Sequence, residues 1–207
     1  MATWSTVRAQ IRRDLEETSA TVWTDDSLIS WANDASYDIA VQTKCMRDWQ
    51  YTTAVVGQSS YDLPARSLEV IEAFFGDSAT VGSRKPLDRQ EFTDWTTLDD
   101  NNGTPLYYAV DDEAIYLRPP PLYAHELSYL RYTYPAAMTA DGDSMPFTDR
   151  ANAAISYYVK SKAKEQISDF DGADIFYDRY LREVDKFAAQ IQKEQQADRY
   201  LAPATVW

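Results

Sequence analysis

The feature that most constrains this chain is a change of hydrophobic period along its length, from helical to β-like and back to helical. Near the start, Val7, Ile11 and Leu15 recur every four residues, a spacing that places them on one face of a helix. The middle alternates short β-branched and aromatic runs with Gly, Pro and Asp. After Thr148 the helical spacing returns. This order predicts helices at both ends of the chain and a separate set of strands in the middle.

The first block predicts two helices between Ser5 and Lys44, separated by a break at residues 18–23. Ser5 is suited to cap the first helix, and either Thr24 or Asp25 the second. The second helix has an apolar stripe made of Leu28, Trp31, Ala35 and Ile39.

The middle block predicts a meander of antiparallel strands. The expected strands are residues 49–56, 60–63, 68–75, 105–110, 114–117 and 126–134. A tight turn is expected at residues 111–113, Asp-Asp-Glu. The segment 88–98 is the exception, because Phe92 and Trp95 indicate a short helix.

The third block predicts two long helices with a break at residues 169–172. The expected apolar face of the first contains Ala151, Ile155, Tyr158, Val159, Ala163 and Ile167. That of the second contains Ile175, Leu181, Val184, Phe187, Ala188 and Ile191.

The two helical pairs cannot each bury an apolar stripe alone, so we expect them to pack together. The predicted fold class is α+β. A helical bundle comprises residues 1–45 and 148–197, an antiparallel β domain is inserted at residues 46–147, and a tail follows at residues 198–207.

The formal net charge of −13, from 33 acidic against 20 basic residues, argues against nucleic-acid binding and against anionic membranes. No uncharged apolar run approaches the roughly 18 residues of a membrane span, and the first residues do not resemble a signal peptide. The single cysteine, Cys45, excludes a disulfide framework within the chain. We expect a soluble product made in a cytoplasm.

No group of residues predicts catalysis, so we expect neither an enzyme nor a cofactor or metal site. His125 is the only histidine, and Cys45 has no histidine near it in the sequence. The glycines are scattered singly, without the spacing of a phosphate-binding loop. The run that begins at Asp141 fails as a calcium loop, because Pro146 and Asn152 stand at its sixth and twelfth positions.

Aromatic side chains indicate a function more clearly than the histidine, cysteine, glycine and acidic residues do. Tyr107, Tyr108 and Tyr116 lie among the later expected strands. They either fill the β core or form a surface where subunits meet. The tail from Tyr200 to Trp207 has no charged side chain. It either folds back on the bundle or docks on a partner, and its candidate contact residues are Tyr200, Leu201, Val206 and Trp207.

The order of several short motifs resembles the phage head-to-tail adaptor family that includes tail tubular protein A of short-tailed phages. The first motif is residues 23–35, Trp-Thr-Asp-Asp-Ser-Leu-Ile-Ser-Trp-Ala-Asn-Asp-Ala, and the second is residues 60–64, Ser-Tyr-Asp-Leu-Pro. Gly-Thr-Pro-Leu-Tyr-Tyr at 103–108 then precedes Ile-Tyr-Leu-Arg-Pro-Pro-Pro at 115–121. Finally, Tyr-Thr-Tyr-Pro at 132–135 leads past Met-Pro-Phe at 145–147 into the closing helices.

This resemblance implies a structural virion protein at the head-tail junction. Members of the family form a cyclic ring, commonly of twelve copies, which sits under the portal protein and receives the tail nozzle. DNA passes through the ring without specific binding. The family has no known catalytic residues.

Two other readings remain open from the sequence. A head-completion or tail-terminator protein of a long-tailed phage could share this architecture. The aromatic β block would also suit a carbohydrate-binding module, because exposed aromatic rings stack on sugars, although such modules rarely carry two helical blocks.

Overall fold

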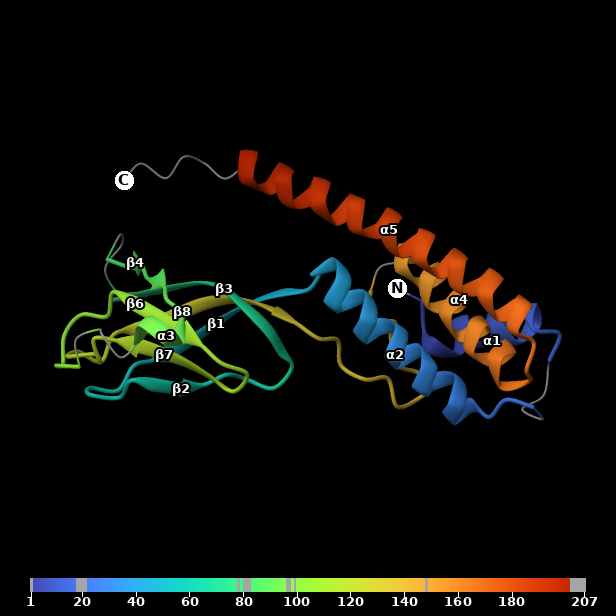
Figure 1. The fold of residues 1–207 in the computed structure, drawn as a ribbon, viewed down its shortest axis with the longest axis horizontal. Helices are drawn as coiled ribbons and strands as arrows, with labels where there is room; N and C mark the ends of the chain where they lie inside the picture. Colours follow the sequence, from blue (N-terminus) through green and yellow to red (C-terminus); the bar gives the residue numbers. More distant parts are fainter. Residues whose placement is uncertain are drawn as a thin grey trace. The chain divides into compact units, whose positions relative to one another are not determined.

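The computed structural model describes residues 2–17, 22–77, 79, 83–95, 98, 100–147 and 149–201, without the side chains of residues 150 and 196–201 (Figure 1). The described residues form two compact units. Among the described residues, one unit unites the N-terminal segment up to Cys45 with the chain from Tyr134 to Leu201, and the other is formed by Met46–Thr133. Helices dominate the first unit and strands the second, which confirms the α+β class.

The helical unit contains α1 (Trp4–Asp14), α2 (Asp25–Thr43), α4 (Asp149–Gln166) and α5 (Phe170–Leu201). Helix α4 packs against the other three, so helices from both ends of the chain share one core (Figure 1). Its fully buried side chains include Trp4, Ile11, Leu28, Ile39, Ile155 and Tyr180. The predicted bundle of N- and C-terminal helices is therefore confirmed.

Helix α2 begins at the predicted cap. The Thr24 side chain accepts a hydrogen bond from the Ser27 amide at 3.1 Å. Asp25 and Asp26 occupy the first turn, where their negative charge is favourable beside the exposed amides. The helix ends where Lys44 adopts a left-handed conformation, with φ of 49°.

The β unit consists of two four-stranded sheets. The first has the order β1-β8-β3-β4, with bounds Arg47–Thr53, Glu126–Thr133, Ser67–Gly76 and Lys85–Pro86. The second has the order β2-β7-β6-β5, with bounds Ser60–Asp62, Ala114–Arg118, Tyr107–Val110 and Asp88–Arg89. The first strand pairs with the last, and β5 runs parallel to β6, so the unit is not a simple antiparallel meander.

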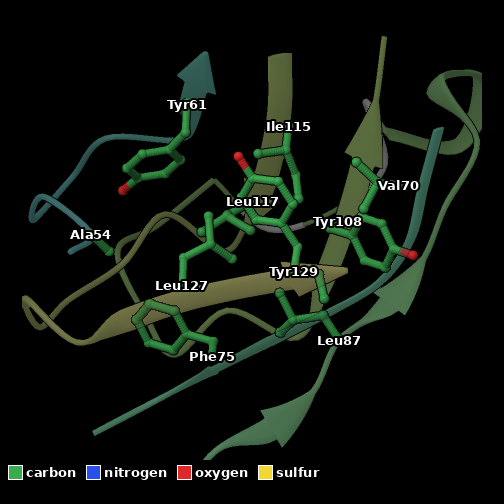
Figure 2. Packing of buried hydrophobic residues seen from close by; sticks show 11 residues of the cluster. Ala54, Tyr61, Val70, Phe75, Leu87, Tyr108, Ile115, Leu117, Leu127 and Tyr129 are labelled. Carbon is green, nitrogen blue, oxygen red and sulfur yellow. The ribbon is translucent and has the colours of Figure 1, made fainter. Parts of the chain in front are cut away.

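The core of the β unit is formed by side chains from both sheets (Figure 2). Val70, Phe75 and Leu127 come from the first sheet, and Tyr108 and Ile115 from the second. The Tyr108 hydroxyl donates to the carbonyl of Ile71, on β3, at 3.4 Å. The two sheets are thus held face to face by one shared core.

Several boundaries differ from the expected ones. Strand β1 begins at Arg47 and ends at Thr53, whereas a strand over 49–56 was predicted. The helix expected at 88–98 is confined to α3 (Phe92–Trp95) and is preceded by β4 and β5, which local patterning did not indicate. A strand of two residues is too short to show an alternating hydrophobic pattern. β4 and β5 are therefore defined by their pairing with β3 and β6.

Three residues expected in the helical core are exposed instead, namely Ile167, Ile175 and Leu181. The buried stripe of α5 runs through Ala173, Tyr180, Val184 and Phe187. The buried side chains of α5 therefore lie on a different side of the helix from the expected one. The sequence has apolar residues on more than one side of α5, so its pattern alone did not select the buried side.

The segment from Tyr134 to Phe147 belongs with the helices, whereas the sequence-based division placed it in the β domain. The Asn33 amide donates to the Met138 carbonyl at 2.9 Å and its oxygen accepts from the Met138 amide at 2.8 Å. The Trp4 amide donates to the Asp143 carbonyl at 2.9 Å. These contacts with α1 and α2 tie an irregular segment, which has no period of its own, to the bundle.

Candidate interaction surfaces

The residues considered for chemistry do not form a reactive centre. The centre of the His125 ring lies 5.9 Å from that of Phe75 and 5.5 Å from that of Tyr123. Burial raises the pKa of the Cys45 thiol, which disfavours the reactive thiolate. The described residues include no group of three or more His, Cys, Asp or Glu side chains that could hold a metal ion. None of the helices that the structure describes is both long and apolar enough to cross a membrane.

The three tyrosines proposed as contact residues have different surroundings. Tyr108 is 2% exposed and belongs to the β core, so its side chain is not available to a partner. Tyr107 is half-buried. Tyr116 is half-buried too; its hydroxyl donates to Asp111 at 2.9 Å, and its ring packs edge-on against Phe92. Tyr107, Tyr108 and Tyr116 therefore do not form one exposed surface.

The candidate residues of the tail lie at or beyond the limit of the described chain. Tyr200 and Leu201 are in the last turn of α5, and their side chains are outside the described set. Val206 and Trp207 lie outside the described residues. Contact by the tail stays a prediction.

An aromatic surface that was not singled out from the sequence lies on the sheet formed by β1, β8, β3 and β4. Trp49 and Tyr51 of β1 are 40% and 57% exposed, and their rings stack at 6.3 Å. The centre of the Phe74 ring, on β3, lies 5.9 Å from that of the Trp49 ring. The Arg84 guanidinium lies 5.7 Å from the centre of the Tyr51 ring and pairs with Glu126 at 2.5 Å. The alternation of Trp49 and Tyr51 along β1 was the available signal, because alternate residues of a strand share a face.

A second surface is a hollow of about 390 Å³ on the helical unit. It is lined by Asp14, Leu15, Glu16, Lys164, Asp169, Gly172, Ile175, Phe176 and Arg179. The Phe176 ring stacks on Tyr157 at 6.3 Å. The Arg179 guanidinium lies 5.8 Å from the centre of the Phe176 ring and 5.9 Å from that of Tyr157.

The charges around the hollow are unevenly compensated. Lys160 pairs with Asp14, and Lys164 with Asp169 at 3.1 Å. Burial would raise the pKa of Asp14, but its hydrogen bond to Lys160 and the charge of that ammonium group together lower it. Arg179, by contrast, has no carboxylate partner within the described part of the chain. Glu16, which also lines the hollow, has no cationic partner among the described residues either. The hollow therefore presents an aromatic wall with one unpaired cation and one unpaired carboxylate, and Arg179 is the part of it that suits an aromatic or acidic group from a partner.

The family model of the SU10 adaptor protein matches residues 2–207. One solved structure, described as the neck of an empty GTA particle computed with C6 symmetry, contains a chain that is 16% identical. That match covers 77% of this chain and 78% of the other, with a TM-score of 0.31. No curated protein matches the sequence significantly.

The family model covers all but the first residue, including both compact units. It supports the expected structural role as a phage head-to-tail adaptor, and names an adaptor family other than that of tail tubular protein A. This chain belongs to the SU10 adaptor protein family.

Proposed function

We propose that this protein is the subunit of an adaptor ring that joins the portal to the tail nozzle of a phage particle and forms part of the channel for DNA. The observation that carries the proposal is the adaptor family model, which matches residues 2–207. On this proposal the protein acts by binding its neighbours and is not an enzyme. Its final location is the head-tail junction of the virion.

A cyclic ring needs a heterologous contact, in which one face of a subunit meets a different face of the next. The hollow on the helical unit is one candidate for such a face, since it would meet a different surface of the next copy. We expect twelve copies, the number that the resemblance to phage adaptors implies.

The end of α5 is the part of the helical unit best suited to contact another protein. Phe187 is the last described buried residue of α5, and the helix continues for roughly four turns after it. Figure 1 shows α5 extending past the end of α4. Isolated helical turns are marginally stable in water, so a partner that covers them would stabilise them. The portal is the expected partner.

The net charge of −13 suits a protein that surrounds DNA without holding it, because like charges repel phosphate. We expect acidic side chains to line the channel. A ring structure with a basic channel surface would contradict this expectation.

The decisive experiment is co-sedimentation of the full chain with the portal ring of the same phage, followed by electron microscopy. A second ring stacked on the portal, with cyclic symmetry, is the expected result and gives the copy number. If an intact portal ring binds nothing, the adaptor role is wrong. A head-completion or tail-terminator role, or glycan binding by Trp49 and Tyr51, would then be tested next.

The tail is tested by deleting residues 198–207. We expect the truncated chain to keep the thermal unfolding of the full chain, because no described core residue lies in this segment. It should lose binding to the portal or to its neighbour. Intact ring formation and intact portal binding by the truncated chain would show that the tail is not an anchor.

A further inference from the structure

The side of α5 away from the hollow carries an exposed apolar stripe. Phe170, Tyr177 and Leu181 are 62%, 43% and 38% exposed. Since each residue advances an α-helix by about 100°, positions separated by seven and eleven residues lie within about 40° of one another. The three side chains therefore form one stripe along the first half of α5, next to the buried stripe through Tyr180.

Acidic side chains flank this stripe. Asp174, Asp178 and Asp185 are exposed and follow the same side of α5. None of the three has an ion-pair partner among the residues described. The stripe thus combines apolar rings with uncompensated negative charge, and we call Phe170, Asp174, Tyr177, Asp178, Leu181 and Asp185 the acidic-aromatic stripe.

In the hollow, Arg179 is the charge complementary to this stripe, and the nearby Glu16 is the lining carboxylate without an ion-pair partner among the described residues. Arg179 lacks a carboxylate partner among the described side chains, and it stacks on aromatic rings. Leu181 and Arg179 are two residues apart, so they point in directions about 160° apart on the helix. Because the stripe and the hollow face opposite ways on one helix, they cannot meet within one copy, but they can meet between two copies.

We propose that the acidic-aromatic stripe of one copy docks in the Arg179 hollow of the next copy. In this contact Arg179 pairs with Asp174 or Asp178 of the neighbour, and the ring of Tyr177 or Phe170 packs against Phe176 and Ile175. A cation between a carboxylate and aromatic rings gains from both the ion pair and the cation–π interaction. This inference rests on the proposed ring function and names the contact through which the ring closes.

The charges favour this head-to-tail arrangement over a symmetric pair. A two-fold contact through the stripes would place the stripe of one copy against that of the other, with Asp174 and Asp178 facing like charges. A two-fold contact of stripe with hollow would need both surfaces of one copy to face the same partner, and they face opposite ways on α5. A contact of stripe with hollow leaves an unused stripe at one end and an unused hollow at the other. Further copies therefore add in the same direction until the ring closes.

The test uses charge reversal in the full chain. Asp178→Arg and Arg179→Glu should each raise the concentration for half-maximal assembly at least about tenfold, because close ion pairs across interfaces couple by more than 1.4 kcal/mol. Each single variant alone should remain unassembled. An equimolar mixture of the two single variants should assemble, because every contact of an alternating ring then pairs an arginine with a carboxylate, and the double variant should recover most of the assembly for the same reason. Lys85→Glu is the matched control, because it makes the same charge reversal at an exposed residue of β4, outside both surfaces. Sedimentation velocity, alone and with the portal ring, measures assembly, and circular dichroism checks folding.

The outcomes separate this inference from the proposed function. If both single variants form rings on the portal as readily as the wild type, or the double variant regains nothing, the contact assigned here is wrong while the adaptor role stands. If the wild-type chain forms no ring alone or on the portal, the proposed function fails, and the contact fails with it. Loss by both single variants and recovery by the double variant supports the contact.

Discussion

Tyr180 illustrates how a single polar atom is accommodated in the helical core. The residue is fully buried, and its hydroxyl donates a hydrogen bond to the Asp38 carboxylate on α2. Burial raises the pKa of Tyr180, and the bond to Asp38 raises it further, so the hydroxyl stays a donor at any physiological pH. The bond ties α5 to α2 at the centre of the bundle.

We therefore expect Tyr180→Phe to lower the free energy of unfolding by about 1.5 kcal/mol. Hydrogen bonds to charged groups contribute about 1.5–3 kcal/mol, and the lower end applies because Asp38 still accepts a hydrogen bond from Gln42. Urea unfolding measures the loss. Tyr177→Phe is the matched control, because the exposed Tyr177 ring should tolerate the change within about 0.5 kcal/mol. Equal effects at the two positions would contradict the role assigned to the bond.

Asp14 and Lys160 form a second polar link in the helical unit, between α1 and α4. The Lys160 side chain is 7% exposed, and Asp14 is its carboxylate partner. Burial would raise the pKa of Asp14, but the hydrogen bond and charge of Lys160 lower it below its ordinary value of 3.8. A lowered folded-state pKa stabilises the fold above the unfolded value, and this contribution disappears as the pH falls through the folded value.

The pair therefore predicts a loss of stability below about pH 4 that depends on Asp14. Asp14→Asn should be less stable than the wild type at pH 7, because it leaves the Lys160 ammonium buried without its carboxylate. It should also lose less stability than the wild type between pH 4 and pH 2. Asp34→Asn, which changes an exposed carboxyl on α2, is the control. If the stability of Asp14→Asn and that of the wild type fall equally with pH, the Asp14–Lys160 pair does not cause the loss at low pH.

At the scale of single elements, α2 is the helix whose start was best determined by local sequence. Thr24 accepts the Ser27 amide in the geometry that its position before Asp25 and Asp26 predicts. Helix α5 behaved differently: it begins at Phe170, inside the break expected at 169–172, and it continues to Leu201, past the end expected at residue 197. Its buried face also differs from the expected one. Ile175 was expected inside and lies on the rim of the hollow.

The cap of α2 can be tested directly. Thr24→Ala should cost about 1 kcal/mol of stability, because an amide of the first turn loses its acceptor. Thr24→Ser keeps a hydroxyl at the same place and should cost much less. The difference between the two variants, measured by thermal or urea unfolding, isolates the hydrogen bond from the loss of a methyl group. No difference between them would mean that water replaces the Thr24 oxygen at no cost.

On the scale of the whole molecule, the β unit is an insertion whose two ends are adjacent. The Thr133 amide donates to the Met46 carbonyl at 3.1 Å, and β1 pairs with β8 along its length. The unit also has its own core, from Val70 to Leu127 and Tyr129 (Figure 2). These features are those of a domain that folds independently of the chain around it.

We expect the fragment of residues 46–133 to fold alone, with a cooperative urea transition and a β-type circular dichroism spectrum. The chain in which a short Gly-Ser linker replaces residues 46–133 should keep its helical spectrum. Leu127→Ala in the fragment is the control, and it should cost about 2–5 kcal/mol because Leu127 is fully buried. A disordered fragment would show that the β unit depends on the helices.

The sequence by itself determined the local features of this protein, namely where α2 begins and which blocks are helical. Local features are encoded by nearby residues, through capping and periodicity, so they can be read without a structure. The tertiary structure alone decided that β1 pairs with β8, that Tyr108 belongs to the core, and that Tyr180, not Leu181, is buried. These outcomes depend on residues distant in the chain, and a helix with apolar residues on several sides does not specify which of them its neighbours will cover.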